Sequence, residues 1–66
     1  MLSARNQFKG IVKSVKLGGI MAEVVVTVGN LELVSAITRT SAEHLNLQAG
    51  DSVTAIIKST EVIIDK

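Results

Sequence analysis

Apolar and polar positions alternate along most of the chain, and glycines interrupt this alternation at a few points. Runs rich in β-branched residues lie between the glycines, which is typical of short strands joined by tight turns. The pattern predicts turns at 17–19 and 29–30 and five strands, over residues 8–16, 20–28, 31–37, 51–58 and 60–65. Strict alternation in the first strand places Val12 and Ser14 on one face and Val15 on the other.

The period changes once, after the third predicted strand. Thr40 and Glu43 have the spacing of a capping box, which predicts a short helix from about Ser41 to Leu47, closed by Gly50. Five short strands with one small helix between the third and the fourth is the order expected of an OB-like barrel. We therefore predict an all-β fold, a small five-stranded OB-like barrel with one short helix.

Length and composition make oligomerisation the expected source of stability. The chain has 66 residues, which is enough for a single domain over residues 1–66, and 47% of them are hydrophobic. A core this small supplies only about 3–5 kcal/mol. With no cysteine and one histidine, the chain has neither disulfides nor a zinc cage to reinforce it. We expect a homo-oligomer.

Charge and hydropathy exclude several partners. The net charge is +1, so there is no general field to attract nucleic acid or an anionic membrane. Apolar runs are too short for a transmembrane helix, and the first residues, MLSARN, do not resemble a secretory signal. We expect a cytoplasmic location.

Nothing in the sequence predicts an enzyme. The single histidine, His44, lies in the predicted helix with no nucleophile at a recognisable spacing. The carboxylates are scattered, without the spacing of an acid–base pair or a metal site. Nucleic-acid binding by an OB-like module needs aromatic residues on which bases stack, and Phe8 is the only aromatic residue. We predict no catalytic residue, no metal-ion site and no nucleic-acid partner.

Three short polar clusters stand out from this apolar background. They are SARN at residues 3–6, TRTS at residues 38–41 and KST at residues 58–60. Nearly all their side chains donate hydrogen bonds, and no carboxylate lies inside any of them. Donors without acceptors suit a small, fully deprotonated tetrahedral oxyanion, whose oxygens only accept hydrogen bonds. The unpaired N–H groups of a helix start beside TRTS would add to such a site.

Each cluster also has a plain structural explanation. Hydroxyls before a helix commonly cap it, SARN resembles a frayed terminus, and KST resembles a solvated bend. Residue chemistry alone therefore leaves three functions open: an oxyanion-binding protein, a nucleic-acid-binding OB module and a purely structural oligomerisation domain.

A family resemblance favours the first of these. SARNQFKG, GIMAEVVV and ITRTSAEHLNLQAGDSVTAIIKSTEVII together resemble the molybdenum-pterin-binding (Mop) domain, which is grouped with the TOBE domains and whose free-standing members are called molbindins. The resemblance covers essentially all 66 residues. SARN followed some fifty residues later by AIIKSTEV is a specific combination, whereas either fragment alone would be weak.

The resemblance implies an OB-like barrel that assembles as a homohexamer, a trimer of dimers, and binds molybdate or tungstate between subunits. The oxyanion-binding residues that it implies are Ser3, Arg5, Lys58 and Ser59, joined by Thr38 and Ser41 from a neighbouring module. No catalytic cofactor is implied, because the metal is bound only as its oxyanion.

Further candidates lie beside these positions. Ala4, Asn6 and Thr60 belong to the same two motifs, and Thr60 either touches the ligand or only bends the strand. The family has a second class of site near the three-fold axis, for which the backbone of Gly18 and Gly19 is a candidate.

Overall fold

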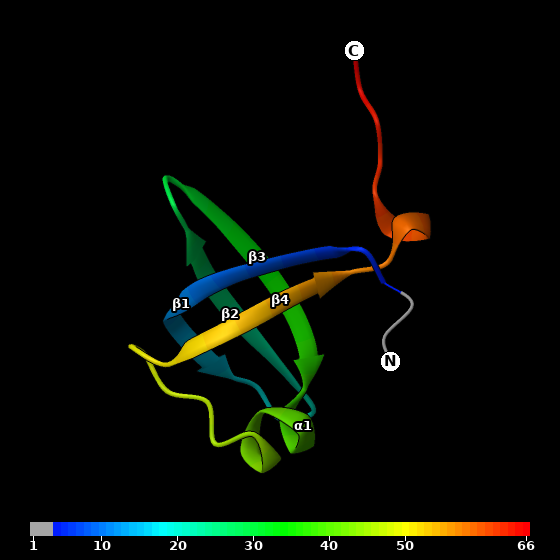
Figure 1. Cartoon of the computed structure of the whole chain (residues 1–66). Helices are drawn as coiled ribbons and strands as arrows, with labels where there is room; N and C mark the ends of the chain where they lie inside the picture. The colour runs from blue at the N-terminus through cyan, green and yellow to red at the C-terminus, as the bar shows by residue number, and fades with distance from the viewer. Residues whose placement is uncertain (1–3) are drawn as a thin grey trace.

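The chain folds around one small antiparallel sheet (Figure 1). The computed structural model describes residues 4–66. Its elements are β1 (Asn6–Leu17), β2 (Met21–Val28), β3 (Leu31–Thr38), α1 (Arg39–His44), β4 (Ser52–Ile57) and a 3₁₀ turn, η1 (Ser59–Glu61). The prediction of an all-β fold with one short helix between the third and fourth strands is confirmed. No helix in the described part is long and apolar enough to cross a membrane.

The long strand β1 is the spine of the sheet. The strand order is β3-β2-β1-β4, and β1 pairs with β4 through its first half and with β2 through its second. Ile11 belongs to both ladders, opposite Thr27 on one side and Ser52 on the other. A glycine is needed at position 10, where β1 passes from one partner strand to the other. A Cβ on this residue would lie only 2.5 Å from the Thr27 carbonyl oxygen.

A bulge in β1 changes which side chains reach the core. The register with β2 shifts between Val12 and Ser14, so Lys13 is the extra residue. The prediction from strict alternation, with Val12 and Val15 on opposite faces, is therefore wrong. Val12 is 1% exposed and Val15 packs against the same core cluster, because one inserted residue reverses the alternation.

The core is made of small side chains and leaves many large ones outside. Val12, Val24 and Val26 form its buried centre, and Ala42 of α1 is also buried. Outside it, exposed large hydrophobic residues include Ile20 at 80% and Val34 at 68%. A small domain that leaves such residues in water has apolar surface available for a partner.

The helix begins and ends at other residues than predicted. Its N-cap is Thr38, whose side-chain oxygen accepts a hydrogen bond from the Ser41 backbone N–H. The prediction of a capping box that starts at Thr40 is therefore wrong. At the other end Asn46 adopts a φ of 49°, and its N–H donates to the Glu43 carbonyl while the Leu47 N–H donates to Ala42. This is a Schellman motif, and it replaces Gly50 as the helix stop.

The predicted fifth strand is wrong for the single chain. Residues 59–61 form η1, and the chain after it runs outside the sheet (orange to red in Figure 1). The apolar residues Ile63 and Ile64 are 91% and 84% exposed, although their sequence predicted a buried strand. An apolar pattern predicts that residues are buried, but it does not identify the surface against which they pack. The four described strands do not close into a barrel, because β3 and β4 do not pair.

Candidate functional site

The register of β1 with β4 brings two of the predicted motifs together. Asn6 pairs with Ile57, and the Asn6 side-chain Nδ2 donates to the Ile57 carbonyl at 3.1 Å. One residue further along each strand, Arg5 and Lys58 therefore leave the same end of the sheet side by side. We call residues 4–6 and 58–60 the strand-end cluster. Ser3, the remaining predicted residue of SARN, lies outside the described residues.

The two cations of the strand-end cluster are available to a ligand. Arg5 and Lys58 are both exposed, and the ion pairs found within residues 4–66 involve neither of them. Glu61 is the carboxylate that follows in the same turn. Its backbone N–H donates to the Lys58 carbonyl at 2.9 Å, but its side chain makes no ion pair with Lys58 in the described structure.

The η1 turn presents the remaining hydroxyls of this cluster. Lys58 is the N-cap of η1 in an extended conformation, so the chain bends sharply at Ser59. Ser59 and Thr60 are exposed on this bend. The structural explanation of KST as a bend is thus correct, and the bend also leaves its hydroxyls free to donate hydrogen bonds.

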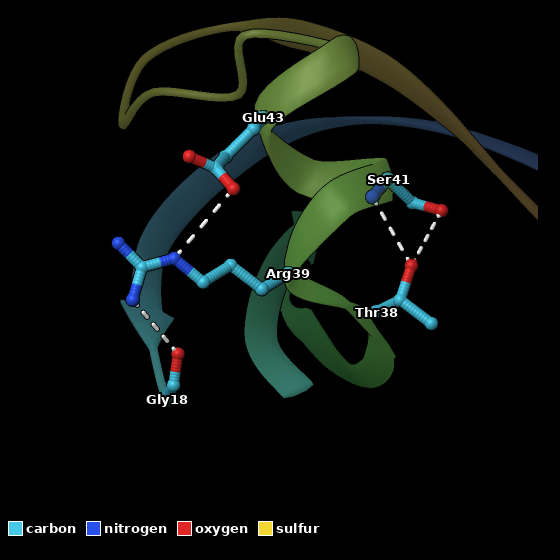
Figure 2. A network of polar contacts seen from close by, with 5 residues as sticks. All are labelled: Gly18, Thr38, Arg39, Ser41 and Glu43. Carbon is cyan, nitrogen blue, oxygen red and sulfur yellow. Dashed lines mark hydrogen bonds and ion pairs between the residues drawn. The ribbon is translucent and has the colours of Figure 1, made fainter. Parts of the chain in front are cut away.

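A second polar cluster surrounds the start of α1 (Figure 2). Thr38 Oγ1 accepts a hydrogen bond from the Ser41 N–H at 3.1 Å and donates one to Ser41 Oγ at 2.8 Å. Both hydroxyls are exposed, so Ser41 keeps its own O–H for another acceptor. We call Thr38, Ser41, Arg39 and the turn at Gly18–Gly19 the helix cluster.

Arg39 ties the turn at Gly18 to α1 and was not predicted as a functional residue. Its Nη1 donates to the Gly18 carbonyl at 3.1 Å, and its Nε lies 3.6 Å from Oε1 of Glu43 (Figure 2). Its backbone N–H also donates to the Ile20 carbonyl at 2.7 Å. The spacing of Arg39 and Glu43, four residues apart in a helix, was the available signal for the ion pair.

The two clusters lie at opposite ends of β1. Asn6 begins this strand beside Lys58, whereas Leu17 ends it beside the first residues of β2. There Met21 pairs with Thr38, which carries the chain into α1. One chain therefore does not bring Thr38 and Ser41 to Arg5 and Lys58. It does place the turn at Gly18 near the start of α1, where the Gly18 carbonyl accepts a hydrogen bond from Arg39.

The chemistry of both clusters is that of hydrogen-bond donation. Exposed guanidinium, ammonium and hydroxyl groups dominate them, and Glu43 is already paired with Arg39. Among residues 4–66, no three side chains of the metal-ligating types lie close enough to hold a metal ion. His44 is an exposed residue in the last turn of α1. Such donor groups can hold an oxyanion.

Comparison with known proteins points the same way. The TOBE domain family matches residues 2–64. "Molybdenum-pterin-binding protein 1" of Clostridium pasteurianum is 47% identical over 64 residues, which span 96% of this chain and 94% of that protein. "Molybdenum transport protein ModE" of Herbaspirillum seropedicae is 40% identical over 94% of this chain, but the match spans only 23% of that longer protein.

Solved structures agree with the fold in detail. A molybdate-binding protein from Sporomusa ovata superposes with a TM-score of 0.96 at 41% identity, covering 100% of this chain and 98% of that one. The cytoplasmic molybdate-binding protein ModG, in a form with molybdate bound, superposes with a TM-score of 0.85 at 42% identity. That match covers 88% of this chain and 42% of ModG.

Proposed function

This chain belongs to the TOBE domain family, and on that premise we propose that it is a cytoplasmic molybdate-binding protein. It binds the oxyanion reversibly, without chemical change, and serves in storage or homeostasis of molybdenum. The observation that carries this proposal is the pairing of Asn6 with Ile57, which sets Arg5 beside Lys58 at one end of the sheet. Tungstate, a dianion of the same shape, is the expected second ligand.

The cations Arg5 and Lys58 offset the charge of the dianion. Moving an unpaired charge out of water is strongly unfavourable, so a bound dianion needs cationic and hydrogen-bonding partners. In the described structure these two side chains carry no carboxylate that would compete for them. Ser3 and Ser59 donate further hydrogen bonds, with Ala4, Asn6 and Thr60 lining the same end.

The proposed pocket is completed by a second subunit. Thr38 and Ser41 donate hydrogen bonds in the family pattern, yet in one chain they lie at the far end of β1 from Lys58. They reach a shared ligand only if the helix cluster of one chain meets the strand-end cluster of another. A homo-oligomer, a hexamer built as a trimer of dimers, provides such contacts. The Gly18–Gly19 backbone then lines either this pocket or a second site near the three-fold axis.

Calorimetric titration of the purified chain with four oxyanions tests the proposal. We expect saturable binding of molybdate and tungstate, and much weaker binding of sulfate and phosphate. Phosphate keeps a proton near neutral pH and would need an acceptor for it, whereas the clusters contain no carboxylate and their cations only donate. No saturable heat with any oxyanion would overturn the proposal and favour a purely structural oligomerisation domain.

Thermal melting at fixed protein concentration is an independent test. A ligand at one hundred times its dissociation constant stabilises the folded state by about 2.7 kcal/mol. For a domain of this size that corresponds to a rise in Tm of roughly 10 °C or more. We expect molybdate to produce this rise, and sodium sulfate at equal ionic strength serves as the control. An unchanged Tm in a folded sample at saturating molybdate would contradict binding.

A further inference from the structure

Two side-chain amides at the start of β1, those of Asn6 and Gln7, donate hydrogen bonds to backbone carbonyl groups. Asn6 Nδ2 donates to the Ile57 carbonyl at 3.1 Å. Gln7 Nε2 donates to the Ala4 carbonyl at 3.0 Å. Within residues 4–66, no other asparagine or glutamine side chain makes a hydrogen bond to the chain. We call Asn6 and Gln7 the amide pair.

The two carbonyl groups that the amide pair engages have equivalent positions beside the two exposed cations. The Ala4 carbonyl belongs to the peptide bond that leads into Arg5. The Ile57 carbonyl belongs to the peptide bond that leads into Lys58. Because Ala4 precedes β1, the ladder between β1 and β4 supplies no donor to its carbonyl. Each cation of the strand-end cluster therefore follows a carbonyl oxygen that already accepts a hydrogen bond from a side-chain amide.

A free carbonyl oxygen at this end of the sheet would oppose the binding of a dianion in two ways. Its partial negative charge repels an oxyanion. It is also an acceptor, so it competes with the anion for the N–H groups of Arg5 and Lys58. A hydrogen bond from an amide weakens both effects, because the N–H group occupies a lone pair and offsets part of the charge on the oxygen. The amide pair thus removes acceptors from a cluster whose cations only donate.

The removal of acceptors also discriminates between oxyanions that differ in protonation. Molybdate and sulfate carry no proton near neutral pH, so all their oxygens accept hydrogen bonds. Hydrogen phosphate keeps one O–H group, which needs an acceptor. A free carbonyl oxygen would stabilise hydrogen phosphate and disfavour sulfate, although the two anions have nearly the same size.

We propose that Asn6 and Gln7 determine the specificity of the strand-end cluster for fully deprotonated oxyanions, by engaging the carbonyl oxygens that precede its two cations. This inference rests on the proposed function. Both amides act through a backbone carbonyl, so they are positioning residues and not ligands of the anion. Gln7 lies outside the motifs from which binding residues were predicted, and the structure assigns it a role through its contact with Ala4.

Competition titrations of Gln7→Met at mildly alkaline pH test the proposal. Methionine keeps the length of the side chain but has no N–H group to donate. Sulfate and phosphate are then both dianions and differ by one proton, and the affinity of each is measured by its displacement of bound molybdate. We expect the affinity for sulfate to fall roughly 2–10-fold while the affinity for phosphate stays the same or rises. Asn6→Ala should change the ratio of the two affinities in the same direction.

Gln48→Met is the matched control. Gln48 is exposed, like Gln7, but its side-chain amide makes no hydrogen bond within residues 4–66. The ratio of sulfate to phosphate affinity should therefore equal that of the unmodified chain. Thermal melting verifies that each variant is folded. Because Asn6 is half-buried, Gln7→Met alone decides the question if Asn6→Ala does not fold.

The outcomes separate this inference from the proposed function. If Gln7→Met lost affinity for sulfate and phosphate equally, the amide would only stiffen the strand end. If neither affinity changed, the Ala4 carbonyl would have no influence on the ligand. Either result overturns the inference and leaves molybdate binding intact. Failure of the unmodified chain to bind molybdate would overturn the proposed function, and this inference with it.

Discussion

The strand-end cluster and the helix cluster each contain an arginine, and the two arginines are in opposite situations. Arg39 is held by the Gly18 carbonyl and the Glu43 carboxylate, whereas Arg5 has no such partner in the described structure. A cation whose hydrogen bonds are already made contributes to the fold. A cation left exposed beside Lys58 can contribute to binding. We therefore expect the same residue type to serve the fold at one position and ligand binding at the other.

The hydroxyls of the two clusters differ in a similar way. Thr38 caps α1, so part of its hydrogen-bonding capacity stabilises the helix. Ser59 starts η1, where the side chain of the N-cap residue, Lys58, makes no capping hydrogen bond. Substitution of Thr38 should therefore change stability and binding together, whereas substitutions of Arg5 and Lys58 in the strand-end cluster should change binding alone.

The largest expected effect is the loss of molybdate binding in Arg5→Ala and Lys58→Ala. Hydrogen bonds to charged groups contribute about 1.5–3 kcal/mol each, so affinity should fall roughly 10–150-fold for either variant. Both side chains are exposed, and the Tm without ligand should stay unchanged. Calorimetric titration and thermal melting measure the two quantities.

Lys13→Ala is the matched control for charge. Lys13 is an exposed lysine on the same sheet, paired with Glu32 at a distance from both clusters. Removing it changes the net charge equally, and an exposed ion pair contributes only about 0–1 kcal/mol to stability. Affinity should remain near that of the unmodified chain. A loss as large as in Lys58→Ala would mean that molybdate responds to net charge and not to the strand-end cluster.

The sequence predicted the order of elements well, because each depends on local alternation and on turns. Prediction from the sequence failed where the local structure depends on a residue far away in the chain. The bulge at Lys13 depends on pairing with β2, and the clamp from Arg39 to Gly18 joins residues 21 positions apart. Ile63 and Ile64 show the same limit, since their pattern predicts a buried strand but not the surface that buries it. The pairing of SARN with KST came from the family resemblance, and the pairing of Asn6 with Ile57 is consistent with it.

An intermediate effect is expected at the helix cluster, where Thr38→Val and Ser41→Ala separate capping from binding. Loss of an N-cap side chain destabilises by about 1 kcal/mol, which lowers Tm by roughly 4–8 °C in a domain of this size. Thr38→Val should show this loss. Ser41→Ala should not, because the Ser41 N–H still donates to Thr38 Oγ1.

Binding should fall in both of these variants. One neutral hydrogen bond is typically about 1 kcal/mol, so molybdate affinity should decrease several-fold, less than for Lys58→Ala. Thr38→Ser keeps both the cap and the hydroxyl and serves as the control. Full affinity in Ser41→Ala would remove Ser41 from the site and leave Thr38 as a capping residue only.

The smallest expected effect, and the sharpest contrast with Arg5, is that of Arg39→Ala. This change removes an exposed hydrogen bond and a helical ion pair between side chains that are 43% and 57% exposed, interactions that together contribute about 1 kcal/mol or less. Tm should fall by a few degrees. Molybdate affinity should change less than in Arg5→Ala, because the Arg39 side chain is already engaged with Gly18 and Glu43 and is not among the proposed ligand-binding residues. Arg39→Lys keeps the charge but loses the two-sided contact, so it should melt like the alanine variant. If Arg39→Ala abolished binding while leaving Tm unchanged, the roles of the two arginines would have to be exchanged.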